Sequence, residues 1–130
     1  MSGVFFQGNA PGYDHSSSDG VFGIGGSTPI IYYLPGTTNW GATWGAYYGR
    51  PTMLWNPQAQ TGDGSFGVQS SQFGFNVSGT TNIPIVVEAC TNLGGAWVLL
   101  QSMNITNGSV HISDPQWTNY AARFYRFRSP

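Results

Sequence analysis

The side chains in this sequence that could supply acid–base chemistry are five carboxylates and two histidines. Asp14 and Asp19 share a polar loop with His15, Glu88 lies inside an apolar run, and Asp114 stands at a turn before a proline. Hydrolysis of a glycosidic bond requires two carboxylates about 5–10 Å apart. If the protein is a hydrolase, its candidate catalytic residues are therefore Asp14, Asp19, Glu88 and Asp114.

Each carboxylate also has an ordinary structural explanation. Asp14 and Asp19 are short polar residues of the kind that punctuate turns, and Asp114 can cap the turn that follows it. Asp63 stands between two glycines in a segment typical of a linker. Glu88 can face solvent by strand alternation, or it can pair with an arginine from the last strand. The sequence leaves both explanations open.

No nucleophilic or metal-binding motif accompanies these residues. His111 alternates with apolar neighbours, which predicts a solvent-facing histidine on a strand, and the other histidine is almost one hundred residues away. The chain contains no G-x-S-x-G elbow, and no lysine follows its glycine-rich segment to hold a phosphate. Cys90 is the single cysteine, so we expect a small buried hydrophobe and no internal disulfide. We expect neither a metal nor a cofactor.

Aromatic rings make up 15% of the sequence and are the other chemical resource. The rings at positions 40, 44, 47 and 48 share one helical face, so the segment 38–49 predicts a short helix or a few turns. Exposed rings would stack on the apolar faces of sugars, whereas buried rings would form the core of a half that has few aliphatic residues. The candidate ligand-binding residues are Trp40, Trp44, Tyr47, Tyr48, Trp55 and Arg50.

The composition excludes several classes of protein. Only 7% of the residues are charged, lysine is absent and the net charge is −1, so the chain lacks the basic surface that a nucleic-acid partner requires. The abundance of aromatic residues argues against disorder, and no apolar run reaches the roughly 18 residues of a membrane span. A net charge near zero does little to keep chains apart, which favours a homo-oligomer.

Short strand-like runs separated by glycine, proline and asparagine predict an all-β fold. We expect a repeat-like β segment over residues 1–56, a glycine-rich polar linker over 57–70 and a small antiparallel β-sandwich over 71–130. Within the sandwich, the pair Asn107-Gly108 predicts a hairpin between the runs 103–106 and 109–113.

Two stretches resemble known bacterial sequences. The pieces VFFQGNAP (4–11), IYYLPGTT (31–38) and LWNP (54–57) resemble the last repeat of surface-antigen-type leucine-rich-repeat proteins. The pieces VVEA (86–89) and SDP (113–115), followed by RFYR, resemble the C-terminal β module of many secreted bacterial proteins. The sequence departs from these patterns because most of the repeat array is absent, an insertion surrounds positions 46–48, and a cysteine occupies position 90 where serine is expected.

The resemblance implies an extracellular or cell-surface role without a catalytic motif, although the chain carries no signal peptide. We therefore expect a non-catalytic accessory module that binds a polysaccharide or another cell-surface component. Two alternatives remain. One is a small glycoside hydrolase acting on a plant polysaccharide such as β-glucan, cellulose or xylan, and the other is a structural cap that shields the end of a repeat array.

Overall fold

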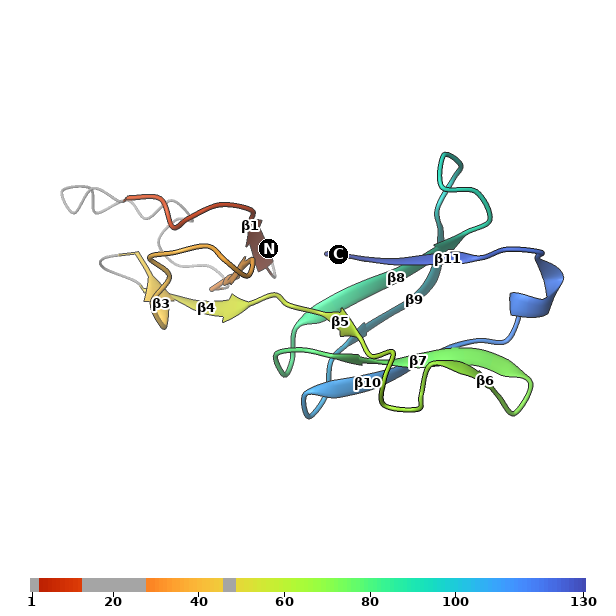
Figure 1. Ribbon diagram of the computed structural model, residues 1–130. Coiled ribbons are helices and arrows are strands. Elements are labelled where there is room, and N and C mark those ends of the chain that lie inside the picture. The colour runs from red at the N-terminus through yellow and green to blue at the C-terminus, as the bar shows by residue number, and fades with distance from the viewer. Residues whose placement is uncertain (1–2, 13–27, 46–48) are drawn as a thin grey trace. The chain divides into compact units, whose positions relative to one another are not determined.

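The computed structural model describes residues 3–12, 28–45 and 49–130, which form two compact units. Unit 1 is Met1–Asn56 and unit 2 is Pro57–Pro130 (Figure 1). The described residues are all-β, with one 3-10 turn, η1 (Trp117–Asn119). No helix within these ranges is long and apolar enough to cross a membrane.

Unit 1 contains a ladder of short parallel strands. Its sheet has the order β1-β2-β4-β3, in which the first three strands are parallel and the last pairing is antiparallel. The register places Val4 beside Ile31 and Ile31 beside Thr52, so successive parallel strands are 27 and 21 residues apart. The strands are β1 (Gly3–Phe6), β2 (Ile30–Tyr33), β3 (Thr43–Trp44) and β4 (Arg50–Leu54).

The segment for which the ring spacing predicts a helix or turns is not helical over its described residues 38–45. It runs in extended form and bends, and it contributes β3 to the edge of the unit 1 sheet. The backbone N–H of Thr52 donates to the carbonyl of Ala42, which continues the contact between this segment and β4. Glycine costs about 1 kcal/mol in a helix, and this segment has glycines at 41 and 45, so sheet pairing prevails over the helical periodicity.

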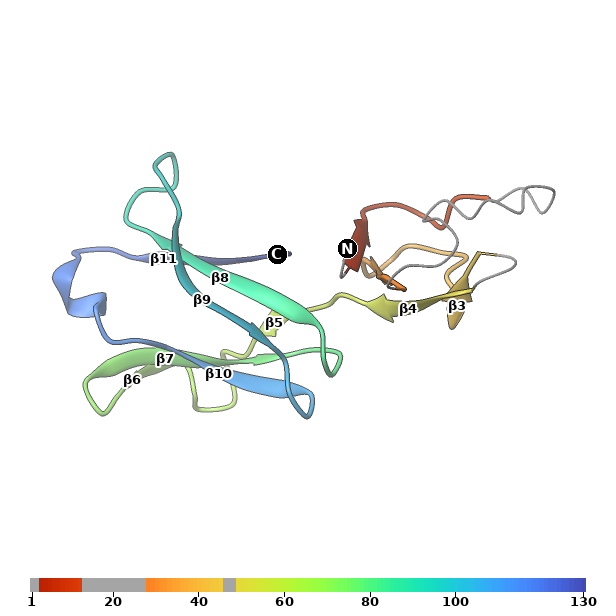
Figure 2. The ribbon, with the colours of Figure 1, turned by 180° about the vertical axis from the view of Figure 1, so that it is seen from behind.

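Unit 2 is a sandwich of two antiparallel sheets, as the sequence predicts (Figures 1 and 2). One sheet has the order β10-β7-β5, with β6 also paired to β7, and the other has the order β11-β8-β9. The first contains β5 (Gln58–Ala59), β6 (Gly67–Gln69), β7 (Gln72–Ser78) and β10 (Ser109–Asp114). The second contains β8 (Pro84–Cys90), β9 (Val98–Asn104) and β11 (Phe124–Arg128).

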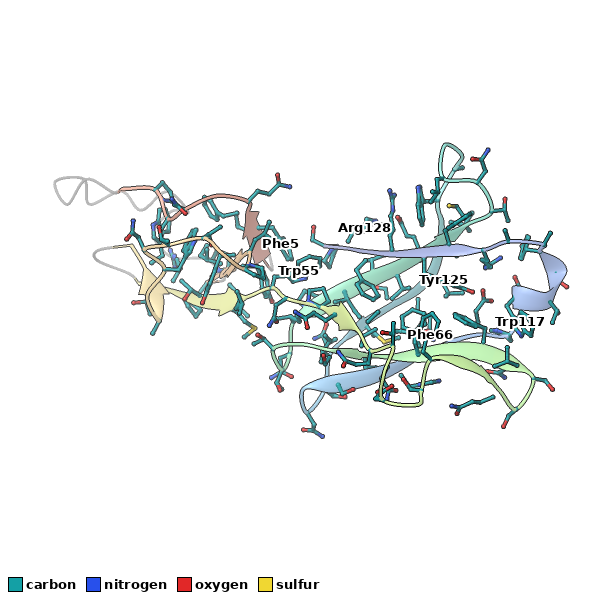
Figure 3. All side chains as sticks on the ribbon, in the orientation of Figure 1. Phe5, Trp55, Phe66, Trp117, Tyr125 and Arg128 are labelled. Carbon is teal, nitrogen blue, oxygen red and sulfur yellow. The ribbon has the colours of Figure 1, made fainter. Side chains whose placement is uncertain are left out.

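Alternating apolar side chains from both sheets form the core of unit 2. Tyr125 of β11 stacks on Phe73 of β7, with ring centroids 5.3 Å apart, and Phe127 meets Phe75 at 6.3 Å. Figure 3 shows Tyr125 between the two layers. Full burial of an aliphatic side chain contributes about 1.5–3 kcal/mol. The fully buried aliphatic residues of this unit are Val77, Ile83, Ile85, Val87, Ile105 and Ile112.

Two connections of unit 2 differ from the sequence expectation. Residues 57–70, predicted to be a linker, instead contribute β5 and β6, which both pair with β7. Asn107 and Gly108 do form a turn, with φ of 51° and 80°, but the strands on either side of it pair in different sheets. Because β9 pairs with β8 and β10 pairs with β7, the turn carries the chain from one layer to the other.

Candidate functional site

A pocket of about 570 Å³ lies at one end of the unit 2 sandwich. At this end β8 and β10 finish, β9 begins, and the segment 115–123 with η1 connects the two layers (Figure 1). Ligand pockets are commonly about 300–1,000 Å³. We call it the Tyr120 pocket, and its lining residues with a polar side chain are Cys90, Thr91, Gln101, Ser113, Asp114, Gln116, Tyr120 and Arg123.

Asp114 organises the wall of the Tyr120 pocket. Its carboxylate is only 1% exposed and accepts hydrogen bonds from the backbone N–H of Gln116 and from the Tyr125 hydroxyl, both at 3.0 Å. The guanidinium Nε of Arg123 lies 2.6 Å from the second carboxylate oxygen, in a buried ion pair. These contacts hold both ends of the segment 115–123 against the sandwich.

The electrostatics of this wall are set by burial around a paired charge. Burial and the hydrogen bond to Asp114 raise the pKa of Tyr125 to about 12. The phenol therefore keeps its proton through the neutral range and continues to donate to the carboxylate. Since Arg123 balances Asp114, the polar wall carries no net charge.

Tyr120 supplies an aromatic surface at the rim of the pocket. The Arg123 guanidinium carbon lies 4.2 Å from the centroid of its ring, which is a cation–π contact, and the residue remains 40% exposed. The other side of the pocket carries Val98 and Leu99, whose side chains are also exposed. The pocket thus combines an exposed ring, an apolar rim and several amide and hydroxyl groups.

Glu88 lies outside this pocket, on the outer face of the β8–β9–β11 sheet. It stands opposite Arg126 in the strand register and accepts hydrogen bonds from Arg126 Nε at 2.8 Å and Arg128 Nε at 2.7 Å. Hydrogen bonds from Arg128 and Arg126 hold the pKa of Glu88 below its usual value. Arg126 also lies 4.3 Å above the ring of Trp97. This is the cross-strand pairing that the sequence offered as the structural explanation of Glu88.

The candidate carboxylates do not converge in the described residues. Glu88 belongs to β8 and is bound to Arg126 and Arg128, whereas Asp114 ends β10 of the other sheet and is bound to Arg123. Asp63 lies on the outer face of the other sheet, where Ser65 and Asn76 donate to it. Asp14 and Asp19 lie outside the described residues.

The candidate aromatic residues of unit 1 pack against its strands. Trp44 is buried, and its indole N–H donates to the carbonyl of Pro11 at 3.0 Å. Trp40 stacks on Tyr33 with ring centroids 5.4 Å apart. Trp55 meets Phe5 edge-on at 6.2 Å, and Figure 3 labels both of these rings. The three tryptophans therefore pack within unit 1 instead of forming the flat exposed row that a binding platform requires.

The other predicted binding residues have separate locations. Arg50 begins β4 and its guanidinium donates to the hydroxyl of Thr28 at 3.4 Å. Tyr47 and Tyr48 fall outside the part of the chain that the structure describes. The exposed rings of the described residues belong instead to unit 2, and they are Phe66, Tyr120 and Phe124.

The sequence reasoning missed Tyr120 and Arg123 as site residues. They lie in and beside a short polar loop whose sequence indicates only a connection between strands. The other residues of the pocket come from strands that are far away in the chain. A loop with Trp117 and Tyr120 directly after an Asp-Pro turn was the available signal, since large rings are uncommon in loops that have no packing or binding role.

No family model matches the chain, and neither the curated proteins nor the solved structures include a significant match to it.

Proposed function

We propose that this protein is a non-catalytic accessory module of an extracellular bacterial protein, and that it binds a neutral polysaccharide through the Tyr120 pocket. The sequence resemblance to secreted bacterial proteins supports the location, and the lining of the pocket supports the ligand class.

The observation that carries the proposal is a charge-balanced pocket with an exposed ring. Asp114 and Arg123 are already paired with each other, so an ionic ligand would gain little, whereas a neutral ligand leaves the pair intact. The exposed ring of Tyr120 can pack on the C–H face of a sugar. Amides and hydroxyls, such as those of Gln101, Gln116 and Thr91, can bind sugar hydroxyl groups.

The distribution of carboxylates favours binding over hydrolysis. A glycosidase places two carboxylates around the scissile bond, but the Tyr120 pocket has one carboxylate, and Arg123 neutralises it. Glu88 is held in its ionised form by two arginines, which is unfavourable for a general acid.

Affinity electrophoresis in gels that contain soluble β-glucan, xylan or mannan tests this proposal. We expect at least one polysaccharide to retard the protein, and we expect Tyr120→Ala to abolish the retardation. Tyr120→Phe is the matched control because it keeps the ring and should retain binding. Reducing-sugar release is measured on the same polysaccharides.

Three results would contradict the proposal. If no polysaccharide changed the migration of the protein, the binding role would be rejected. If Tyr120→Ala were still retarded, the Tyr120 pocket would be rejected as the binding site. Release of reducing sugar would reject the non-catalytic role and favour the hydrolase alternative.

Unit 1 favours a second candidate function, that of a cap on a repeat array. Its parallel strands are 27 and 21 residues apart, within the 20–29 residues of leucine-rich repeats. A cap is stabilised by stacking on a neighbouring repeat. Fusion of a consensus leucine-rich repeat of about 24 residues ahead of residue 1 should therefore raise the unfolding temperature of unit 1. An unchanged temperature would contradict this candidate.

A further inference from the structure

A second hollow lies on the outer face of the β7–β10 sheet. Its volume is about 290 Å³, and the hairpin between β6 and β7 forms one side of it. The proposed function does not use this hollow, which we call the His111 pocket. Its lining is mostly polar and includes Ser65, Gln69, Gln72, Gly74, His111 and Ser113.

A chain of hydrogen bonds fixes the imidazole of His111. The backbone N–H and the hydroxyl of Ser65 donate to one oxygen of Asp63 at 2.9 and 2.6 Å, and Asn76 Nδ2 donates to the other oxygen at 2.9 Å. Asn76 Oδ1 lies 2.9 Å from His111 Nδ1. The hydrogen bonds from Ser65 and Asn76 lower the pKa of Asp63, so it remains an ionised acceptor.

This chain determines which nitrogen of His111 carries the proton. An ionised carboxylate only accepts hydrogen bonds, so the amide group of Asn76 must point its NH₂ toward Asp63 and its carbonyl toward His111. The carbonyl in turn requires a hydrogen on His111 Nδ1. In the neutral imidazole, Nε2 is then left with a free lone pair, which can accept a hydrogen bond from a hydroxyl group.

Gly74 provides the space in which Nε2 lies. A Cβ at position 74 would come within 2.7 Å of His111 Nε2 and within 2.7 Å of the carbonyl oxygen of Ile112. The absent side chain therefore allows the ring to lie close to the strand, with Nε2 directed over Gly74 in the His111 pocket.

Ser113 lines both pockets. Its backbone N–H faces Gln101 Oε1 at 3.5 Å, on the side of the Tyr120 pocket. Its hydroxyl donates to Gln72 Oε1, on the side of the His111 pocket. Ser113 belongs to β10, an edge strand of its sheet, so the two pockets are separated only by this edge.

We propose that the His111 pocket is a second subsite for the same polysaccharide, whose chain crosses the edge of β10 at Ser113. His111 Nε2 accepts a hydrogen bond from a sugar hydroxyl there, and the amides of Gln69 and Gln72 bind neighbouring hydroxyls. This inference rests on the proposed function, because the Tyr120 pocket holds the other end of the ligand. It goes further in requiring an oligomeric ligand long enough to reach both pockets.

Calorimetric titration of the full chain with oligosaccharides of two to six sugars, in the β-glucan, xylan and mannan series, tests the inference. We expect affinity to rise with length. His111→Ala should lower the affinity for the hexasaccharide about tenfold, because one good hydrogen bond is lost. The affinity for the disaccharide should stay the same. Ser109→Ala is the matched control, because Ser109 lies on the same strand outside the pocket.

A direct spectroscopic readout accompanies the titration. In long-range ¹H–¹⁵N spectra the hexasaccharide should shift the His111 Nε2 resonance, and the disaccharide should not. Affinity that does not depend on length, or equal effects of His111→Ala on short and long ligands, would overturn the second subsite and leave the proposed function standing. If the parent chain binds none of these oligosaccharides, both the second subsite and the proposed function are overturned.

Discussion

At the scale of single residues, the polar groups of unit 2 are ordered by a few charged side chains. Asp114 orders the wall of the Tyr120 pocket, and Asp63 orders the imidazole of His111 through Asn76. In both places a carboxylate accepts hydrogen bonds from several groups, so its position is fixed before any ligand arrives. Preorganisation of this kind is typical of binding sites.

The first prediction concerns the tautomer of His111. We expect its neutral form to carry hydrogen on Nδ1, because Asn76 presents a carbonyl oxygen to that atom. Long-range ¹H–¹⁵N correlation spectra at high pH distinguish the two tautomers. Asn76→Ala removes the acceptor and should release the preference, while the other histidine of the chain supplies an internal reference. A parent protein with hydrogen on Nε2 would contradict the hydrogen-bond chain.

The second prediction concerns stability at high pH. The pKa of Tyr125 is about 12 in the folded protein and about 10 for an exposed tyrosine, so its contribution to the free energy of unfolding is complete below pH 10. That contribution is lost as the pH rises from 10 to 12, since the unfolded chain ionises first. Urea unfolding at pH 9, 10 and 11 should therefore show a shallower decline for Tyr125→Phe than for the parent. If the free energies of unfolding of the parent and of Tyr125→Phe declined in parallel with pH, the raised pKa of Tyr125 would be contradicted.

At the scale of elements, the partners of β9 and β10 were decided by the core and not by proximity along the chain. The runs around Asn107-Gly108 predict a hairpin, and the turn itself forms. However, β9 pairs with β8, and β10 pairs with β7. Ile105, between the two strands, is fully buried, and its backbone N–H donates to the carbonyl of Ile83. The turn thus serves to join the two sheets.

The third prediction tests this connection. Gly108 has φ of 80°, which a residue with a Cβ adopts at a cost, so Gly108→Ala should lower the free energy of unfolding by about 1 kcal/mol. Gly62→Ala is the matched control, because no atom lies within 4 Å of the added Cβ and φ is not positive. Urea unfolding at neutral pH measures the difference. Equal free energies of unfolding for the Gly108→Ala and Gly62→Ala variants would show that the positive φ of Gly108 does not contribute to stability.

At the scale of the whole molecule, the two units are built on different principles. Unit 1 pairs three short strands in parallel beside aromatic rings, whereas unit 2 packs two antiparallel sheets around a core of aliphatic and aromatic side chains. Among the described residues, the arginine-paired carboxylates are Glu88 and Asp114 of unit 2, and their arginines all come from the last eight residues.

The fourth prediction is that residues 57–130 fold alone. This unit exceeds the roughly 60 residues at which many domains fold independently, and it has its own buried core. A dispersed ¹H–¹⁵N spectrum and a cooperative thermal transition are the expected results. A shorter chain of residues 71–130 lacks β5 and β6, which pair with β7, and it should unfold at a lower temperature. Equal unfolding temperatures would contradict a structural role for residues 57–70.

The sequence by itself determined the all-β class and the positions of most strands, and it offered the pairing of Glu88 with arginine as one of two explanations. These follow from local alternation, from turn residues and from the cost of leaving a carboxylate unpaired in an apolar strand. Tertiary structure alone decided the burial of Trp44, the sheet to which each strand belongs, and the pockets around Tyr120 and His111. The physical reason is that a pocket is formed by residues distant in sequence, such as Gln101 and Arg123, whose approach depends on how the two sheets pack.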